Sequence, residues 1–304
     1  MSNTPDLGPV PQRITVTAPQ VRRLIEAQFP QWAGLPVQPV ASGGWDNWTF
    51  HLGAGMLVRL PSAAEYALAV DKEHRWLPVL ARRLPLPIPV PLAKGEPGAG
   101  YPYPWSVYPW LDGEPASAGR IADPARFAAD LAGFLAALRG TDPAGGPRPG
   151  KHNWFRGGTL RTYDGAAQSA LTTLDGHIDA DLARRIWQTA LDARGEGPES
   201  WFHGDVAEGN LLLRDGQLAA VIDFGTCGVG DPACDLAIAW TLLTAEGRQI
   251  FRERLSVGQA EWSRGRGWAL WKTLVACAST LAGDDEEEAA DARRVLGEIL
   301  SATN

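Results

Sequence analysis

The spacing of hydrophobic residues predicts a helix followed by a small sheet near the start of the chain. In residues 18–29, Val21, Leu24 and Ile25 recur on one side of a helix that Pro30 would end. Three strand-like segments follow, at residues 37–41, 47–52 and 56–60. The turns between them contain Gly43-Gly44 and Gly53-Ala54-Gly55, which is typical of consecutive strands joined by tight turns.

A second helix is expected directly after the third strand. Ser62 and Glu65 have the spacing of a capping box at its start. Residues spaced about one turn apart then mark its apolar side: Tyr66, Val70 and Leu77. Pro78 lacks the backbone N–H that a helix interior needs, so we expect it to truncate or kink this helix just after Leu77.

One charged residue, Glu73, falls on the apolar side of this second helix. Burying an isolated carboxylate is costly, so Glu73 should have a cationic partner. Arg59, at the end of the third strand, is the best candidate, and the nearest lysine is Lys72. The pattern therefore predicts a buried ion pair between the sheet and the helix.

Proline-rich and aromatic segments complete the first third of the chain. Residues 86–91 alternate proline with apolar residues, which predicts an edge strand because proline cannot donate to the strand ladder. Residues 104–113 are aromatic and apolar and are expected to form the last strand of the sheet. The sheet should therefore end near residue 110.

Beyond this point the hydrophobic pattern is mainly helical. Asp123 and Pro124 have the pattern of an N-cap and a first helical turn, and Asp284 is expected to cap the last helix. Short strands are expected at residues 201–202, 211–213 and 218–222, whereas residues 151–165 are irregular and cannot be placed. The expected helices are residues 124–138, 163–174, 179–193, 246–255, 261–282 and 284–300.

Composition narrows the class of protein. The 304 residues are 45% hydrophobic and 21% charged, which is enough apolar material for a substantial core. A net charge of -7 argues against a nucleic-acid-binding protein. Three cysteines without a C-x-x-C pair favour a location in the reducing cytoplasm. The sequence contains no run of about eighteen apolar residues, so no membrane-spanning helix is expected.

Two short segments carry the side chains that phosphoryl transfer requires. Asp205 follows His203-Gly204, and Asn210 comes five residues after Asp205. Asp223-Phe224-Gly225 follows after a predicted hairpin. A base beside a hydroxyl group, together with oxygen ligands for Mg²⁺, is what transfer from a nucleoside triphosphate needs.

The order and spacing of these segments resemble the aminoglycoside phosphotransferase family, a branch of the protein-kinase-like fold. The H-G-D-x-x-x-x-N loop of that family matches residues 203–210, and its second signature is similar to residues 223–237. A weaker resemblance extends from about residue 35 to the C-terminus. It implies an α+β fold of two lobes: a small one with an antiparallel sheet and a helix at residues 1–110, and a larger, mainly helical one at residues 111–304.

The resemblance also implies roles for the residues of these loops. Asp205 would be the base that orients and deprotonates an acceptor hydroxyl, and Asn210 and Asp223 would hold Mg²⁺ against the triphosphate. His203 would hold the loop by packing and hydrogen bonding. Asp231 and Asp235 would be supportive, the first as a helix cap and the second as an acceptor for backbone N–H groups of the catalytic loop.

Nucleotide contacts are expected from both lobes. Ser42 lies in the glycine-rich turn, whose backbone N–H groups can approach phosphate oxygens. Where the family pairs a strand lysine with a helix glutamate, this chain has Arg59 and Glu73. Either Arg59 replaces that lysine, or Lys72 reaches the phosphates, or the Arg59–Glu73 pair is only structural. Further contacts are expected from hinge backbone groups and hairpin side chains: Pro109, Leu111, Leu212 and Ile222.

The resemblance implies a kinase that transfers the γ-phosphoryl group of ATP or GTP to a hydroxyl of a small molecule, first of all an aminoglycoside-like acceptor. A metabolite kinase acting on an amino alcohol, a sugar or a macrolide-type hydroxyl stays open, and so does a catalytically inactive nucleotide-binding regulator. No A-P-E segment follows Asp223, which disfavours protein substrates. The sequence does not decide the oligomeric state.

Overall fold

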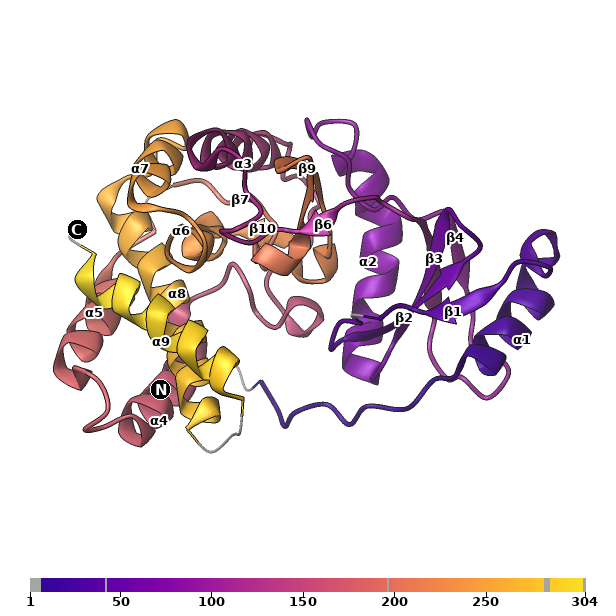
Figure 1. The fold of residues 1–304 in the computed structure, drawn as a ribbon, viewed down its shortest axis with the longest axis horizontal. Coiled ribbons are helices and arrows are strands. Elements are labelled where there is room, and N and C mark those ends of the chain that lie inside the picture. The colour runs from indigo at the N-terminus through magenta and orange to yellow at the C-terminus, as the bar shows by residue number, and fades with distance from the viewer. Residues whose placement is uncertain (1–6, 42, 196, 282–284, 303–304) are drawn as a thin grey trace.

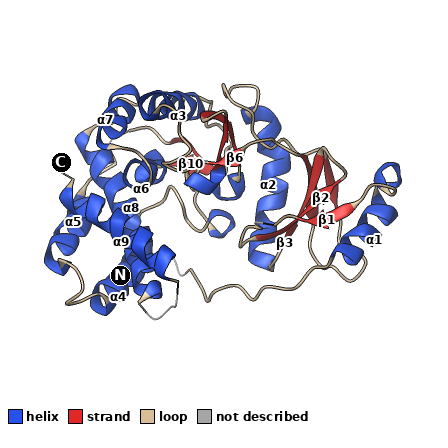
Figure 2. Ribbon diagram, viewed as in Figure 1, coloured by secondary structure: helices blue, strands red, loops and turns tan. Residues whose placement is uncertain are grey.

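The computed structural model describes residues 7–41, 43–195, 197–281 and 285–302. Figure 1 shows two lobes, with the sheet, α1 and α2 on one side and most of the helices on the other. Colouring by secondary structure makes the same division plain, because the long strands belong to the smaller lobe (Figure 2). The expected two-lobed α+β fold, with an antiparallel sheet and a larger helical part, is confirmed.

The smaller lobe is built on one antiparallel sheet with the strand order β1-β2-β3-β5-β4. Its elements are α1 (Ala18–Gln28), β1 (Val37–Pro39), β2 (Asn47–Leu52), β3 (Met56–Pro61), α2 (Ala64–Leu80), β4 (Ala93–Gly95) and β5 (Trp105–Pro109). Val21, Leu24 and Ile25 of α1 are buried in one hydrophobic cluster with residues of the sheet such as Phe50 and Val107. The periodicity of the sequence thus identified the face of α1 that packs on the sheet.

Two details at the ends of α2 differ from expectation. The capping box is wrong: Ala63 is the N-cap residue, and the hydroxyl of Ser62 donates to the carbonyl of Trp45 instead. The break at Pro78 is also wrong, because α2 continues to Leu80. Leu77 and Leu80 are fully buried against the core of the larger lobe, and this packing offsets the hydrogen bond that Pro78 removes.

The edge strand expected at residues 86–91 is not formed. β4, just after it, pairs with β5 and is the edge of the sheet. The proline-rich segment instead contacts the larger lobe, where Ile88 is buried and the carbonyl of Pro87 accepts the N–H of Val221. Three prolines in six residues remove the donors that a strand would need.

The larger lobe surrounds two small antiparallel sheets with helices. One sheet has the order β6-β8-β9, and the other pairs β10 with β7. The strands are β6 (Glu114–Pro115), β7 (Ser200–Phe202), β8 (Leu211–Arg214), β9 (Gln217–Val221) and β10 (Gly228–Gly230). The helices are α3 (Pro124–Arg139), α4 (Asp164–Thr173), α5 (Ala180–Asp192), α6 (Ile238–Thr241), α7 (Ala245–Arg254), α8 (Gln259–Thr280) and α9 (Glu286–Ser301). Short 3₁₀ helices lie at Lys151–Asn153, Leu160–Tyr163, Glu208–Asn210, Phe224–Thr226 and Pro232–Ala237, and one lies in the smaller lobe at Pro30–Trp32.

Tryptophans provide much of the core of the larger lobe. Trp187, Trp201, Trp240 and Trp268 are almost completely buried there. At the start of α9, the expected cap Asp284 lies outside the described residues, and Asp285 accepts the N–H groups of Glu287 and Glu288. None of the helices in the described part of the chain is both long enough and apolar enough to cross a bilayer.

Candidate active site

Two loops of the larger lobe meet because the strands that carry them are paired. β7 leads into His203 and β10 follows Asp223, and Phe202 lies opposite Gly228 in the pairing of these strands. The β8–β9 hairpin closes the other side, where the N–H of Ile222 donates to the carbonyl of Asn210. Residues 203–210 and 222–226 therefore form one compact unit, as their order in the sequence predicted.

His203 connects the two loops through its imidazole ring. Its Nε2 lies 2.9 Å from the carbonyl oxygen of Ile222, so this nitrogen must be the donor. Its Nδ1 then accepts the backbone N–H of Asp205 at 3.2 Å. The ring is completely buried. The geometry gives His203 a role in holding the loop, as expected.

Asp235 stabilises the start of the loop at residues 203–210. Its carboxylate is fully buried and accepts the N–H groups of His203 at 2.9 Å and Gly204 at 2.7 Å. Gly204 has a φ of +85°, and a Cβ atom there would lie 2.6 Å from the carbonyl oxygen of Thr226. The loop can therefore take this course only with glycine at position 204. The expected supporting role of Asp235 is confirmed by these contacts.

Asp205 and Asn210 face each other across the loop of residues 203–210. The Nδ2 of Asn210 donates to the Oδ2 of Asp205 at 3.2 Å and to its backbone carbonyl at 2.9 Å. These bonds leave the Oδ1 of Asn210 as an acceptor oxygen. Asp223 has a left-handed backbone with φ 64°, and its Oδ1 accepts a hydrogen bond from Arg59. Asn210 and Asp223 both line the cavity between the lobes.

These two residues fit a magnesium ion. Mg²⁺ prefers oxygen ligands and is usually held by one or two carboxylates together with substrate phosphates. In the described part of the chain, no group of three or more His, Cys, Asp or Glu side chains could hold a metal alone. The Oδ1 of Asn210 and the carboxylate of Asp223 are therefore a suitable protein contribution to a site that the nucleotide would complete.

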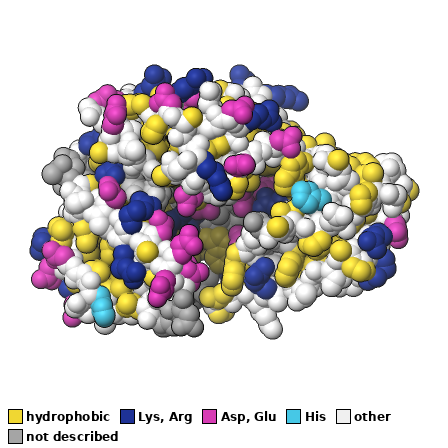
Figure 3. Space-filling view, viewed as in Figure 1, with side chains coloured by type: hydrophobic (Ala, Val, Ile, Leu, Met, Phe, Trp, Pro, Cys, Tyr) yellow, Lys and Arg dark blue, Asp and Glu magenta, His cyan; other side chains and the backbone are white. Residues whose placement is uncertain are grey.

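The cavity between the lobes has a volume of about 570 Å³. The space-filling view shows a hollow at this place with apolar side chains in its depth (Figure 3). Gly43 and Gly44 of the glycine-rich turn line it, whereas Ser42 lies outside the described residues. Five of the residues expected to contact the nucleotide also line it: Arg59, Pro109, Leu111, Leu212 and Ile222.

Glu73 does not line this cavity but lies behind Arg59. The Nη1 of Arg59 is 3.9 Å from the Oε1 of Glu73, and its Nη2 is 2.9 Å from the Oδ1 of Asp223. Burial raises the pKa of Glu73, and Arg59 partly offsets this effect. The hydroxyl of Tyr108 also donates to Glu73 at 2.5 Å. The predicted pair of Arg59 and Glu73 exists, and Asp223 is a third member that the sequence did not reveal.

Lys72 is turned away from the cavity. Its ammonium group donates to the carbonyls of Gly225 at 2.6 Å and Cys227 at 3.1 Å. Burial lowers the pKa of Lys72, and the nearby charges of Glu73 and Asp223 only partly offset this effect. Of the three interpretations of the missing lysine, the one in which Lys72 reaches the phosphates disagrees with this geometry. Arg59 is the cation of the smaller lobe that lines the cavity.

Sequence reasoning missed the cations next to Asp205. The Nζ of Lys272, on α8, lies 2.5 Å from the Oδ1 of Asp205. Burial tends to raise the pKa of Asp205, but Lys272 outweighs this effect and, with help from Arg156, lowers it to about 2. Arg156 belongs to the irregular segment that could not be placed. The only signal in the sequence was the stripe of Trp268 and Trp271 on the helix that carries Lys272.

Asp46 is a further charged group that sequence reasoning did not single out. It follows the glycine-rich turn and lines the cavity near Asp223. Burial, and then the nearby charge of Asp223, raise its pKa to about 6.

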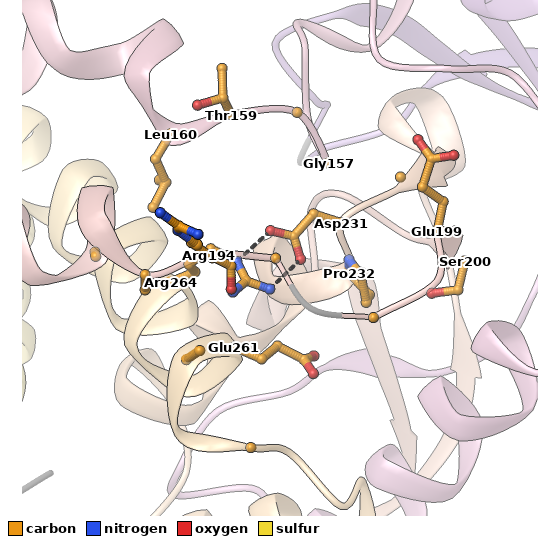
Figure 4. Close-up of a pocket in the computed structure, with 18 of the residues that line it drawn as sticks. Gly157, Thr159, Leu160, Arg194, Glu199, Ser200, Asp231, Pro232, Glu261 and Arg264 are labelled. Carbon is orange, nitrogen blue, oxygen red and sulfur yellow. Dashed lines mark hydrogen bonds and ion pairs between the residues drawn. The ribbon is translucent and has the colours of Figure 1, made fainter.

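A second cavity, of about 760 Å³, lies at the opposite end of β7 from the loop of residues 203–210, next to Ser200 (Figure 4). Four of its charged side chains form two ion pairs across it. Arg264 binds both carboxylate oxygens of Asp231, at 2.6 and 3.1 Å, and Arg139 lies 2.9 Å from Glu261. Asp231 also accepts the N–H of Ala233, which confirms the expected helix cap. This cavity contains none of the residues expected to act in catalysis.

Similar solved structures support the fold. The GDP complex of aminoglycoside 2′-phosphotransferase-IIIa is 18% identical with a TM-score of 0.70, and the match covers 94% of this chain and 99% of that one. A macrolide 2′-phosphotransferase type I is 21% identical with a TM-score of 0.60, covering 94% and 98%. The apoenzyme of macrolide 2′-phosphotransferase MphH from Brachybacterium faecium is 20% identical with a TM-score of 0.56, covering 93% and 99%. At these identities the likeness shows a common kinase-like fold.

No curated protein matches the chain. A family model does match it, over residues 37–268. This range begins at the first strand of the small lobe and ends within α8, so it contains both loops of the candidate site. Because it spans well over half of the 304 residues, the chain belongs to the phosphotransferase enzyme family.

Proposed function

We propose that this protein is a small-molecule kinase that transfers the γ-phosphoryl group of ATP or GTP to a hydroxyl of an aminoglycoside-like acceptor. One observation carries the proposal: Asn210 and Asp223 line the cavity between the two lobes, and Asp205 is hydrogen-bonded to Asn210. Phosphoryl transfer needs positioned oxygen ligands and a positioned base more than any covalent chemistry from the protein.

The donor nucleotide would lie in the cavity of about 570 Å³. Leu57, Leu212 and Ile222 provide apolar walls for a purine. The N–H of Trp110 donates to the carbonyl of Gly55. Along a strand, the carbonyl of Pro109 points to the side opposite to this N–H, so it is available to the purine base. Arg59 and the glycine-rich turn would face the phosphates.

The acceptor would approach Asp205. Its carboxylate accepts a hydrogen bond from the acceptor hydroxyl and takes the proton as the oxygen attacks the γ-phosphorus. The bond between the γ-phosphorus and the β–γ bridging oxygen then breaks, and its electron pair leaves with the nucleoside diphosphate. A magnesium ion bound by Asn210 and Asp223 would neutralise charge on the phosphate oxygens. The protein residues orient the reactants and hold the proton.

The family relatives and the charges near the loop favour an aminoglycoside-like acceptor. The similar solved structures include aminoglycoside 2′-phosphotransferase-IIIa. Burial, and then Asp291 of α9, raise the pKa of Glu208 in the catalytic loop, so two acidic groups lie close together there; Arg294, paired with Asp291 at 2.7 Å, opposes this effect. Acidic groups suit a cationic acceptor. A macrolide-type hydroxyl is the second candidate, because macrolide 2′-phosphotransferases are similar to this chain over as much of its length.

We also propose that the boundary between the nucleotide-covering lobe, residues 1–110, and the catalytic lobe, residues 111–304, lies at the end of β5.

We propose a cytoplasmic location as well, since all three cysteines are free thiols and ATP is available in the cytoplasm.

The test is a phosphorylation screen with purified protein, ATP or GTP, and a panel of aminoglycosides, macrolides and metabolite alcohols. We expect Asp205→Asn to abolish turnover and to keep Mg-nucleotide binding, and Asp223→Asn to lose both. Nucleotide affinity measured by calorimetry would separate the two variants. Equal affinity in the wild type and Asp223→Asn would refute the metal assignment, and no turnover with any acceptor would refute the proposed reaction.

A further inference from the structure

Asp205 carries a salt bridge from a distant part of the chain. The Nζ of Lys272 lies 2.5 Å from its Oδ1, and the two residues are 67 positions apart. The other oxygen, Oδ2, accepts from Asn210. The side chain of Lys272 is 27% exposed and that of Asp205 is 37% exposed, so both are partly accessible to solvent while their charged ends are in contact.

The catalytic loop itself contains no cation between Asp205 and Asn210. Its four intervening residues are Val206, Ala207, Glu208 and Gly209. On the nucleotide side, Arg59 is held by Asp223 and Glu73. Lys272 is therefore the cation that touches the carboxylate assigned to the acceptor hydroxyl.

This contact places Lys272 beside the reacting atoms. An acceptor hydroxyl that donates to Asp205 lies about 2.7 Å from a carboxylate oxygen. In a reactive arrangement the attacked phosphorus is about 3–3.5 Å from that hydroxyl oxygen. An ammonium group has three donors, so Lys272 can keep Asp205 and also reach an oxygen of the transferring phosphoryl group.

Arg156 holds the part of α8 that carries Lys272. Its guanidinium carbon lies 4.6 Å from the ring centre of Trp271, 5.3 Å from Tyr163 and 5.5 Å from Trp268. Its Nε and Nη1 are buried without a hydrogen-bond partner. Because Trp271 precedes Lys272 directly, the stack of Arg156 on these rings sets the position of the lysine.

The backbone around Arg156 is unusually constrained. Trp154 and Phe155 have φ values of 53° and 57°, and Gly157 has a φ of 70°. A Cβ atom at Gly157 would lie 2.0 Å from the ring of Phe202, so only glycine fits. Non-glycine residues in this region cost about 1–3 kcal/mol each and often occur at functional sites. Here the strained turn presents Arg156 to the rings of α8.

We propose that Lys272 is a further catalytic residue and that Arg156 positions it. This inference rests on the proposed kinase function. As the acceptor oxygen bonds to the γ-phosphorus and the bond to the β–γ bridging oxygen breaks, the acceptor proton passes to Asp205. Lys272 keeps its own protons. Its positive charge stabilises the oxygens of the transferring group, and its hydrogen bond keeps Asp205 directed at the acceptor.

The first test compares Lys272→Met and Lys272→Arg with Lys94→Met. Lys94 is a suitable control, because it forms an ion pair of 2.7 Å with Asp71 and is similarly exposed, but lies on β4, the edge strand of the sheet in the smaller lobe. We expect Lys272→Met to lower kcat about 100-fold or more. Nucleotide affinity should change by less than about 3-fold, and Lys94→Met should match the wild type.

The second test measures whether the ammonium group of residue 272 itself is required for activity. Lys272→Ala should regain activity when ethylamine is added to the assay, and Lys272→Arg should keep more activity than Lys272→Met. Arg156→Lys, which keeps the charge but loses the planar stack, should lower kcat without changing nucleotide affinity. Thermal melting of every variant shows whether the fold is intact.

The outcomes separate the inference from the proposed function. If the wild type phosphorylates an acceptor and Lys272→Met is equally fast, the role of Lys272 is wrong and the proposed function stands. The same holds if Lys272→Ala is inactive but ethylamine has no effect on a folded protein. If the wild type neither binds Mg-nucleotide nor phosphorylates any acceptor, the proposed function itself fails.

Discussion

Replacing Arg59 by methionine is expected to destabilise the ligand-free protein by about 3 kcal/mol. Arg59 is 14% exposed, and its partner Glu73 is 7% exposed. Removing one member of a buried ion pair costs about 3–5 kcal/mol, because the other charge stays in a poor environment. The lower end of this range applies here for two reasons. Glu73 keeps its hydrogen bond from Tyr108, and the carboxylate of Asp223 can be hydrated because it is 38% exposed.

An exposed pair provides the matched comparison. Lys94 and Asp71 are 33% and 78% exposed, although their atoms are only 2.7 Å apart. Water stabilises both charges there, so Lys94→Met should cost about 1 kcal/mol or less. The two substitutions remove the same kind of interaction, and they differ mainly in burial. A difference of about 2 kcal/mol between them is the quantity to be measured.

Urea unfolding at pH 7 followed by circular dichroism measures this difference, and thermal melting gives a second readout. About 2 °C per kcal/mol for a chain of this size corresponds to a loss of about 6 °C for Arg59→Met. The loss should shrink at acidic pH. Burial already raises the pKa of Glu73, so without Arg59 the folded state takes up a proton there more readily, and its penalty disappears as the pH falls.

The double variant Arg59→Met, Glu73→Gln completes the experiment. If the penalty comes from an unpaired buried carboxylate, the double variant should be more stable than Arg59→Met alone, with a coupling of about 1–3 kcal/mol. Equal losses for Arg59→Met and Lys94→Met would contradict the reasoning from burial. If the stability loss of the double variant equals the sum of the losses of Arg59→Met and Glu73→Gln, the two residues do not interact.

Three further predictions concern residues around the loops. Asp235→Asn replaces an acceptor of two buried N–H groups by one that also carries an NH₂, so it should destabilise the fold by about 1–3 kcal/mol and lower kcat while nucleotide affinity stays, as melting and calorimetry would show. Gly157→Ala should cost at least about 2 kcal/mol in urea unfolding, because its φ is +70° and the new Cβ meets the ring of Phe202. For Asp46 the folded-state pKa is about 6 against 3.8, so its contribution to stability is present at lower pH and is lost as the pH rises through about 6. Asp46→Asn should flatten this part of the melting profile of the ligand-free protein, and an unchanged profile would refute the assignment.

The sequence by itself determined the features that depend on neighbours in the chain. The pattern of Val21, Leu24 and Ile25 located a helix and its buried face, since burial along one side leaves a period of 3.6 residues. The spacing of Asp205, Asn210 and Asp223 identified both loops and the hairpin between them. Glu73 on an apolar face called for a cation, and Arg59 supplies it. In each case a local pattern records a requirement that the fold must satisfy.

Only the tertiary structure decided which groups meet across the fold. Lys272 reaches Asp205 from α8, and Arg156 reaches the rings of that helix from an irregular turn with left-handed residues. Nothing in the spacing of these residues marks such contacts, because they depend on how helices pack. Pro78 stays within α2 for the same reason: burial of Leu77 and Leu80 against the other lobe outweighs the local preference of proline. Local rules describe single elements, whereas the charges around Asp205 come from elements that only packing brings together.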